Sequence, residues 1–255
     1  MPDQALKRQY LEAMGIQTWS LRAQAGTQSE RPPPEVSPEL ASCSGSESAS
    51  SAMGAVASTP MAGPVEGLEW GDLETRVLTC RACGLHETRT QAVFGIGDRD
   101  ADLMVIGEAP GADEDRQGKP FVGRAGQLLN AMLFAIGLRR EQVFIANVLK
   151  CRPPGNRDPR PEETAHCEPF LLRQVELVRP KVILAVGRIS AQNLLRTSDT
   201  VGRLRGRVHA FGSHGIPLVV TYHPAYLLRS PDQKPKAWLD LQRVIQLLDC
   251  GSIGA

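Results

Sequence analysis

Four short apolar runs alternate with amphipathic segments from residue 69 onward, and this alternation constrains the fold more than any other feature. The apolar runs cover residues 102–107, 143–149, 181–186 and 217–222. The segments with helical periodicity cover residues 69–79, 125–136, 161–178, 188–195 and 234–249. Short apolar strands between amphipathic helices indicate a parallel sheet that is covered on both faces. The sequence therefore predicts an α/β fold, an α/β/α sandwich around a central four-stranded parallel sheet.

The composition changes on the N-terminal side of residue 67. Residues 24–66 are rich in Ser, Pro and Ala and contain few large apolar side chains, so we expect a disordered linker. Residues 1–23 contain a short helical pattern over residues 3–14. This segment is a docking peptide for a protein partner, a piece that folds back, or a solvated remnant. The folded domain is expected over residues 67–250.

No apolar run approaches the roughly 18 to 20 residues of a membrane span, and the first residues lack the apolar segment of a signal peptide. We therefore expect a cytoplasmic protein without membrane contact, and a monomer. Residues 80–255 hold 24 Lys and Arg against 18 Asp and Glu, whereas residues 1–79 hold 5 against 10. The positive excess in the folded part is compatible with nucleic acid as a partner.

In a protein that is not exported, the six cysteines need an explanation other than disulfides. Two residues separate Cys80 from Cys83, Cys151 follows the second strand, and Cys167 lies in the next helix. A close pair with a distant pair could bind zinc or an iron–sulfur cluster, and the spacing does not choose between them. The alternative is that all four are ordinary buried thiols.

Ligands of open α/β sheets bind at the carboxyl ends of the strands, so the segments that follow the strands are candidate site loops. The first loop, GEAPGADEDRQGKPFVG, fits neither a P-loop nor the dinucleotide fingerprint, and its carboxylates would repel a phosphate. Asn147 interrupts the apolar second strand, where its amide forms a structural hydrogen bond or reads the edge of a base. His223 ends the fourth strand and would face the same crevice.

Three segments together resemble the signature motifs of family 4 uracil-DNA glycosylases: GEAPGADEDRQGKPFVGRAGQLL, NVLKCRPPGNRDPRPEE and HPAYLLR. The resemblance covers about Leu68 to Leu248. It implies the uracil-DNA glycosylase fold and an enzyme that flips uracil out of DNA and hydrolyses its N-glycosidic bond. Such an enzyme leaves an abasic site, which begins the base excision repair of deaminated cytosine. We expect it to be monofunctional, because no lysine occupies an evident nucleophile position for strand cleavage.

The resemblance also implies a cofactor and the residues that recognise the base. It implies a 4Fe–4S cluster whose ligands are Cys80, Cys83, Cys151 and Cys167. Phe121 would stack on the flipped uracil, and the Asn147 amide would pair with its O4 and N3–H edge, which rejects cytosine. His223 would donate a hydrogen bond to uracil O2 and stabilise the leaving anion.

Carboxylates of the first loop would stabilise the sugar cation and orient water. Glu108 is the first choice for this catalytic role and Glu114 the second. Ala109 is expected to line the substrate pocket, at a position where the best-known glycosylase family has a water-activating aspartate. This difference implies a mechanism that depends on stabilising the leaving group and the cation more than on a strong base.

The remaining expectations concern DNA outside the pocket. Leu227, Leu228 or Arg229 would fill the gap that the extruded base leaves, with core packing as the alternative for one of the leucines. Cations that could contact phosphates lie beside the second strand and in the VGRLRGR run; they are Lys150, Arg152, Arg157, Arg160, Arg203, Arg205 and Arg207.

Two other functions remain open at the level of the sequence. A relative of this family traps the uracil site covalently through a histidine on an inserted loop, so the chain could bind uracil-DNA without turnover. RPPGNRDPRPEE, after Cys151, contains neither that insertion nor a histidine. The other function is that of a zinc-stabilised nucleotide-binding protein, which would be colourless.

Overall fold

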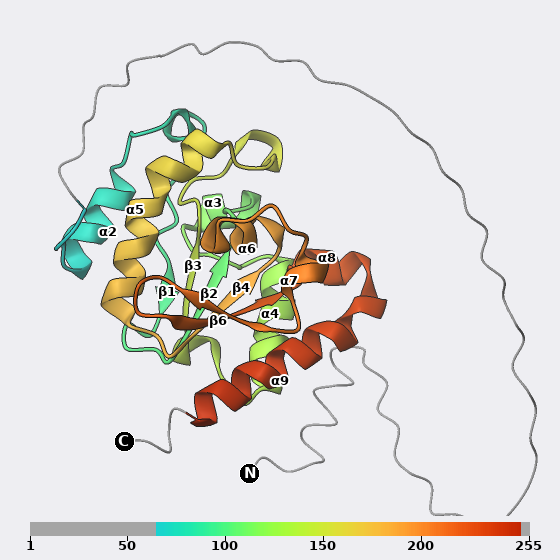
Figure 1. The fold of residues 1–255 in the computed structure, drawn as a ribbon. Helices are drawn as coiled ribbons and strands as arrows, with labels where there is room; N and C mark the ends of the chain where they lie inside the picture. The colour runs from blue at the N-terminus through green and yellow to red at the C-terminus, as the bar shows by residue number, and fades with distance from the viewer. Residues whose placement is uncertain (1–64, 251–255) are drawn as a thin grey trace, which may run out of the picture. The chain divides into compact units, whose positions relative to one another are not determined.

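Six strands run through residues 65–250, the part of the chain that the computed structural model describes. They are β1 (Ile96–Gly97), β2 (Leu103–Gly107), β3 (Phe144–Asn147), β4 (Val182–Val186), β5 (Val208–Phe211) and β6 (Ile216–Thr221). All six belong to one sheet in the order β1-β3-β2-β4-β6-β5, at the centre of Figure 1. The helix predicted within residues 1–23 and nearly all of the linker predicted over 24–66 lie outside the described residues.

The predicted four-stranded parallel sheet is present as the middle of a larger mixed sheet. Strands β3, β2, β4 and β6 are parallel to their neighbours, whereas β1 and β5 add antiparallel edges. The prediction of a four-stranded sheet therefore missed these two edge strands. Strand β1 has two residues, and β5 exposes alternate side chains at the sheet edge, so neither presents an apolar run.

The five predicted helices are present, with bounds that differ by at most one residue. They are α2 (Trp70–Leu78), α4 (Arg124–Ala135), α5 (Pro161–Val178), α6 (Arg188–Leu195) and α9 (Lys234–Cys250). Short helices also occur in segments that the sequence predicted as loops: α3 (Ala112–Gln117), α7 (Val201–Leu204), α8 (Pro224–Arg229), and the 3₁₀ turns η1 (Gly84–Glu87), η2 (Arg140–Gln142), η3 (Pro154–Asn156) and η4 (Pro231–Gln233). Helices of four to six residues are too short to show a helical period.

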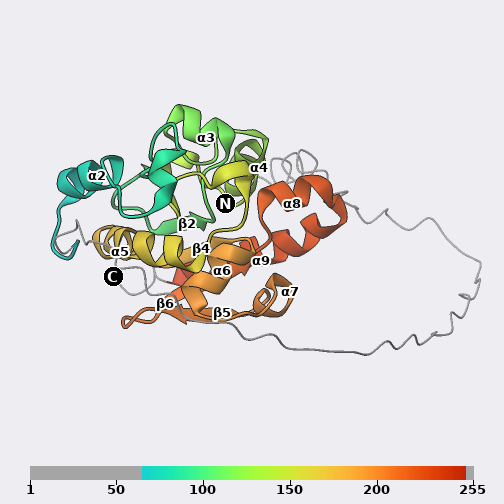
Figure 2. The ribbon, with the colours of Figure 1, turned by 90° about the horizontal axis from the view of Figure 1, so that it is seen from above.

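The alternation of side chains along the strands divides the core into two layers. Met104 and Ile106 of β2 face the layer that contains α2, α5 and α6. Leu103 and Val105 face the opposite layer, which contains α4 and α9. Helices therefore cover both faces of the sheet, as Figures 1 and 2 show, and the predicted α/β/α sandwich is confirmed. Helix α2 lies beside α5 on one face, and α8 lies beside α4.

The register of the parallel strands brings their carboxyl ends to one edge of the sheet. Gly107 at the end of β2 pairs with Asn147 at the end of β3, and Val186 at the end of β4 pairs with Thr221 at the end of β6. Ser190 in α6 donates a buried hydrogen bond of 2.7 Å to the carbonyl of Ile106, which anchors α6 to the end of β2. The four loops that follow these strands consequently start side by side. No helix among residues 65–250 is long and apolar enough to cross a membrane.

Candidate functional site

A cavity of about 720 Å³ opens where the parallel strands end. Residues from the loops after β2, β3, β4 and β6 line it. The structure brings seven of the predicted site residues together in its wall: Glu108, Ala109, Glu114, Phe121, Asn147, His223 and Arg229. Three segments that are distant in the sequence therefore share one site.

Asn147 supplies a buried polar group without a partner. Its side chain is 2 % exposed, and its Oδ1 has no hydrogen-bond partner among the described residues. Leaving a buried acceptor unpaired costs about 1–3 kcal/mol, so such a group needs an explanation. The backbone of Asn147 is fixed, because the carbonyl accepts a bond of 2.9 Å from Lys150 Nζ. The structural bond that was the alternative role for this amide is not seen at Oδ1, which remains an unpaired acceptor in the cavity wall.

Phe121 lies next to Asn147 with an unusual backbone. Its φ of 52° places a non-glycine residue in the left-handed region. A Cβ at Gly107 would lie 2.4 Å from Asn147 Oδ1 and 2.7 Å from the Phe121 ring, so only glycine fits between these side chains. The Phe121 ring also lies 5.7 Å from the His223 ring, at an interplanar angle of 30°. Amide, aromatic ring and imidazole therefore form one cluster.

His223 is the residue immediately before α8, and its hydrogen bonds define its tautomer. The backbone N–H of Ala225 donates to Nδ1 at 3.1 Å, so Nδ1 carries no proton. Burial, together with the nearby Arg229 and against the opposing effect of Glu114, lowers the pKa of His223 to about 4. The imidazole is therefore neutral at pH 7 and carries its hydrogen on Nε2. Gly187, with φ of 97°, permits this placement because a Cβ there would be 3.0 Å from His223 Cβ.

The two candidate glutamates have different surroundings. Both carboxylate oxygens of Glu114 accept backbone bonds: Oε2 from Gly111 at 3.1 Å, and Oε1 from Val122 at 2.9 Å and Gly123 at 3.2 Å. Glu114 therefore ties the start of α3 to the segment before α4.

Glu108 lines the cavity, and no hydrogen bond to its carboxylate is found among residues 65–250. Burial raises the pKa of Glu108, the nearby Asp158 raises it further, and Arg188 opposes them. A carboxylate without protein partners and with a raised pKa suits a group that accepts a proton from water.

The expected wedge residues separate into core and surface. Leu227 is 1 % exposed and packs in the core layer of α4 and α9, the position that was the alternative for one of the leucines. Leu228 is 36 % exposed, and Arg229 is exposed at the cavity wall. Leu228 and Arg229, at the end of α8, are thus the two of these three side chains that can reach DNA.

The expected phosphate contacts also separate. Lys150 is 2 % exposed, so it cannot reach a phosphate; its Nζ instead donates to Asn147 O and to Gln174 Oε1 at 2.6 Å. The guanidinium of Arg205 donates to both oxygens of Asp240, at 2.9 and 3.0 Å, and lies over the Tyr222 ring. Arg152 is half-buried, and its Nε donates to Asn156 Oδ1 at 2.8 Å.

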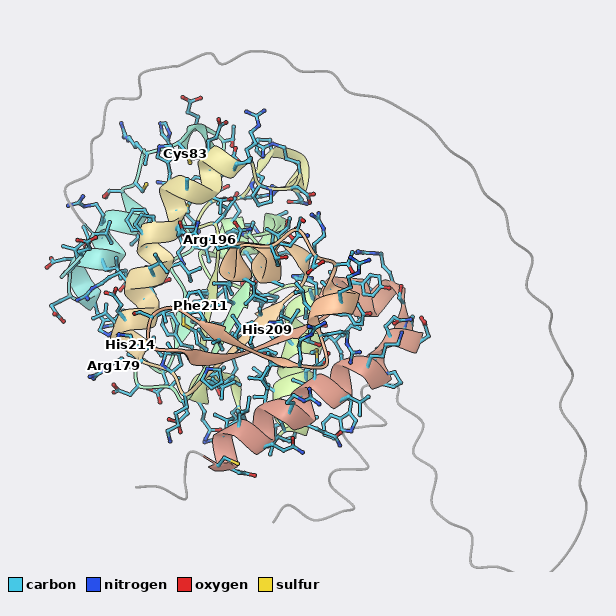
Figure 3. The ribbon with its side chains drawn as sticks, in the orientation of Figure 1. Cys83, Arg179, Arg196, His209, Phe211 and His214 are labelled. Atoms are coloured by element: carbon cyan, nitrogen blue, oxygen red, sulfur yellow. The ribbon has the colours of Figure 1, made fainter. Side chains whose placement is uncertain are left out.

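A second, smaller cavity is lined by the four cysteines, Cys80, Cys83, Cys151 and Cys167. Cys83 lies near one end of α5 (Figure 3), and Cys151 and Cys167 are each 3 % exposed. Burial raises the pKa of Cys83 and of Cys151, and raises that of Cys167 to about 12. Arg89 Nη1 donates to Cys151 Sγ at 2.9 Å.

The four thiols and the side chains around them can be compared with what a metal group requires. Within residues 65–250 no group of three or more His, Cys, Asp or Glu side chains is arranged to hold a metal ion. The four thiols nevertheless line one cavity together with Arg89, and four cysteine thiolates are the donor set that iron–sulfur clusters use.

The sequence did not single out Arg140, Gln174 and Gly187. These residues contact Phe121, Lys150 and His223, respectively. None lies in a signature segment, and their contacts join elements that are distant in the sequence. The one available signal was Gly187, a glycine at the end of an apolar strand, where a close approach of backbone is common.

The sequence is similar to known proteins over the same region. Residues 94–242 match the Uracil DNA glycosylase superfamily. The chain is 45% identical over 186 residues to a type-4 uracil-DNA glycosylase of Archaeoglobus fulgidus, which covers 71% of this chain and 92% of the relative. It is 46% identical over 157 residues to a type-4 uracil-DNA glycosylase of Thermotoga maritima, which covers 61% of this chain and 81% of the relative. A type-5 uracil-DNA glycosylase of Pyrobaculum aerophilum is 31% identical over 146 residues, 51% of this chain and 64% of the relative.

Proposed function

Since this chain belongs to the uracil DNA glycosylase superfamily, among its type-4 enzymes, it is a hydrolase that excises uracil from DNA, and we propose that the cavity at the strand ends is where it does so. The observation that carries the proposal is the unpartnered Asn147 Oδ1, which lies beside the Phe121 ring. That ring in turn lies 5.7 Å from the His223 imidazole. These three groups supply an edge reader, a stacking surface and a hydrogen-bond donor.

Recognition of uracil rests on the amide of Asn147. Its Oδ1 accepts the N3–H of uracil, and its Nδ2–H donates to O4. Cytosine has an acceptor at N3 and a donor at C4, so both bonds are lost with cytosine. A mismatch between buried polar groups costs about 1–3 kcal/mol, which is roughly 5- to 150-fold in discrimination. The bond from Lys150 Nζ to the Asn147 carbonyl fixes the backbone that carries this amide.

Bond cleavage rests on His223. When the bond between C1′ and uracil N1 breaks, its electron pair stays with uracil, and negative charge develops at O2. The neutral His223 donates its Nε2–H to that oxygen, and its orientation is set by the bond from Ala225 N to Nδ1. Because the imidazole stays neutral, it stabilises the anion by a hydrogen bond and does not give up a proton.

Water completes the reaction at C1′. We assign its orientation to Glu108, whose carboxylate lines the cavity without a protein partner, and we assign loop structure to Glu114, whose oxygens are occupied by three backbone amides. The carboxylate of Glu108 also stabilises the cationic sugar. The water oxygen adds to C1′ as its proton passes to the Glu108 carboxylate, and the departing uracil anion takes up a proton from solvent. The products are free uracil and an abasic site.

The cysteine cavity is a separate part of the proposal. Cys80, Cys83, Cys151 and Cys167 would hold a 4Fe–4S cluster through their thiolates. When bound, the cluster supplies a rigid crosslink between three segments of the chain, and we assign it no step in excision. Arg89 places positive charge beside the Cys151 sulfur.

The test is a glycosylase assay on end-labelled DNA that contains one uracil. We expect the iron-loaded protein to leave the strand intact until alkali is added, and alkali then to cut at the uracil position. Breaks before alkali would contradict a monofunctional enzyme, and a heat-stable protein–DNA adduct would favour covalent trapping. Protein that contains zinc without iron or labile sulfide would contradict the cluster.

A further inference from the structure

Arg140 has no part in the reaction described above, yet its guanidinium binds the backbone that carries Phe121. It lies in η2, after α4, and outside all three signature segments. Its Nη1 donates to the Phe121 carbonyl at 3.1 Å and to Asn130 Oδ1 at 3.1 Å, and its Nη2 donates to the Pro120 carbonyl. One side chain therefore fixes two successive carbonyl groups.

The backbone of Phe121 requires such support. A phenylalanine with φ of 52° lies in a region that non-glycine residues avoid, and such a conformation persists only where its surroundings determine it. The Phe121 carbonyl also packs against Gly126, where an added Cβ would lie 1.8 Å from it. The segment is therefore held in a conformation that its own sequence does not favour.

Arg140 and Glu114, which carry opposite charges, both bind the backbone of residues 120–123. The cation of Arg140 binds the carbonyl oxygens of Pro120 and Phe121, whereas the anion of Glu114 accepts the N–H groups of Val122 and Gly123. Each charge meets the end of the peptide dipole that it attracts, and charge-assisted bonds are stronger than neutral ones. Glu114 was a candidate from the sequence, but its cationic counterpart was not.

We propose that Arg140 is a positioning residue for base stacking: it fixes the Pro120–Phe121 backbone so that the Phe121 ring stands preset beside Gly107 and His223. The inference rests on the proposed function, because Phe121 is the stacking surface only if the cavity receives uracil. A preset ring binds the flipped base without first having to be ordered.

The first test compares Arg140→Ala with Arg139→Ala, a matched control whose exposed arginine immediately precedes it. Misplacement of a group that aligns the substrate can cost about 100-fold, so we expect single-turnover excision to fall roughly 10- to 100-fold in Arg140→Ala. Arg139→Ala should match the wild-type rate. The dissociation constant for the same DNA without uracil should stay the same, because the Arg140 guanidinium is bound to protein groups and does not line the cavity. Arg140→Lys, which can bind one carbonyl, should recover part of the rate.

The decisive test is a double-mutant cycle with Phe121→Ala. If Arg140 acts through the ring, adding Arg140→Ala to Phe121→Ala should slow excision by less than about twofold. The same fold loss in both backgrounds would overturn the proposal, as would a wild-type rate in folded Arg140→Ala. Wild-type protein that releases no uracil would overturn the proposed function itself. An active enzyme in which Phe121→Ala changes nothing would overturn only the stacking role and this inference.

Discussion

At the scale of single residues, the site combines three strained or unsatisfied features that a stable fold would avoid. Asn147 Oδ1 is buried without a partner, Phe121 has a positive φ, and the pKa of His223 is lowered to about 4. Such features cluster at functional sites, because a site prepared for a ligand leaves groups that only the ligand satisfies. Uracil would satisfy the first, stack on the second and accept a bond from the third.

Asn147 permits a prediction about base choice. In Asn147→Asp the carboxylate can no longer donate to O4 and repels it, so uracil excision should fall roughly 10- to 100-fold. A carboxylate accepts from the amino group of cytosine, so cytosine excision should become detectable. Single-turnover rates on matched DNAs with uracil or cytosine test this. Unchanged uracil excision in the variant would contradict the role of the amide.

His223 permits a prediction about pH and stability. In the unfolded chain a histidine binds its proton near its ordinary pKa of about 6.5, whereas in the native state His223 binds one only near pH 4. The unfolded state therefore binds more protons between these values, and stability falls as pH falls from about 6.5 to 4. Melting temperatures of His223→Gln should fall less over this range than those of wild type. Parallel curves for the two proteins would refute the neutral imidazole.

The two glutamates should separate in a paired experiment. Glu108→Gln should lower the excision rate and leave the melting temperature unchanged, whereas Glu114→Gln should lower the melting temperature because its amide cannot accept all three backbone bonds as a carboxylate does. Since the pKa of Glu108 is raised, wild-type activity should fall as the pH drops through that raised value. Glu108→Gln should lack this acid limb. If wild type and Glu108→Gln had the same pH profile, the loss of activity at low pH would have to come from a group other than Glu108.

At the scale of elements, the sequence predicts the helices and strands whose apolar residues recur regularly, and it misses those without such a pattern. The apolar run of β2 and the amphipathic pattern of α5 are visible because many residues repeat one signal. Helix α3 is not visible, because ADEDRQ has no apolar face and its start is fixed by Glu114 folding back on Gly111. The edge strand β5, which carries His209 and Phe211 in Figure 3, exposes alternate residues at the edge of the sheet.

In the candidate site, too, the sequence predicts only the residues that stand out in a local pattern. Asn147 and His223 are predictable, because polar residues at the carboxyl ends of apolar strands stand out in a sequence. The burial of Leu227 and Lys150, and the bonds of Arg140 to the Phe121 segment, are not predictable from local sequence. They depend on which elements pack against them, and packing partners are distant along the chain.

The cysteine cavity permits a prediction at this scale. Cys80 and Cys83 lie between α2 and η1, Cys151 follows β3, and Cys167 lies in α5, so a cluster would crosslink three segments. Removing iron by chelation, or replacing Cys167 by Ser, should lower the melting temperature and bleach the brown colour. Cys250→Ser, at the exposed end of α9, is the control and should keep both. A wild-type protein that is colourless, and whose melting temperature does not change on chelation, would contradict the cluster.

At the scale of the whole molecule, the residues that we propose for recognition and chemistry share one edge of the sheet, while the cysteines line a separate cavity. The route between them is short in sequence: Asn147, at the end of β3, and Cys151 are four residues apart, and buried Lys150 bonds back to the Asn147 carbonyl. All the residues assigned to the reaction lie within residues 65–250. Residues 65–250 should therefore contain everything that is needed to release uracil.

The most direct measurement of that claim is the amount of free uracil released. Full-length, iron-loaded protein should release one uracil for each abasic site formed from uracil-containing DNA, and no base from the same DNA with thymine or cytosine. His223→Ala should release uracil roughly 100- to 1,000-fold more slowly, as expected when one oxyanion donor is removed. Abasic sites without free uracil, or an unchanged rate in His223→Ala, would contradict the account.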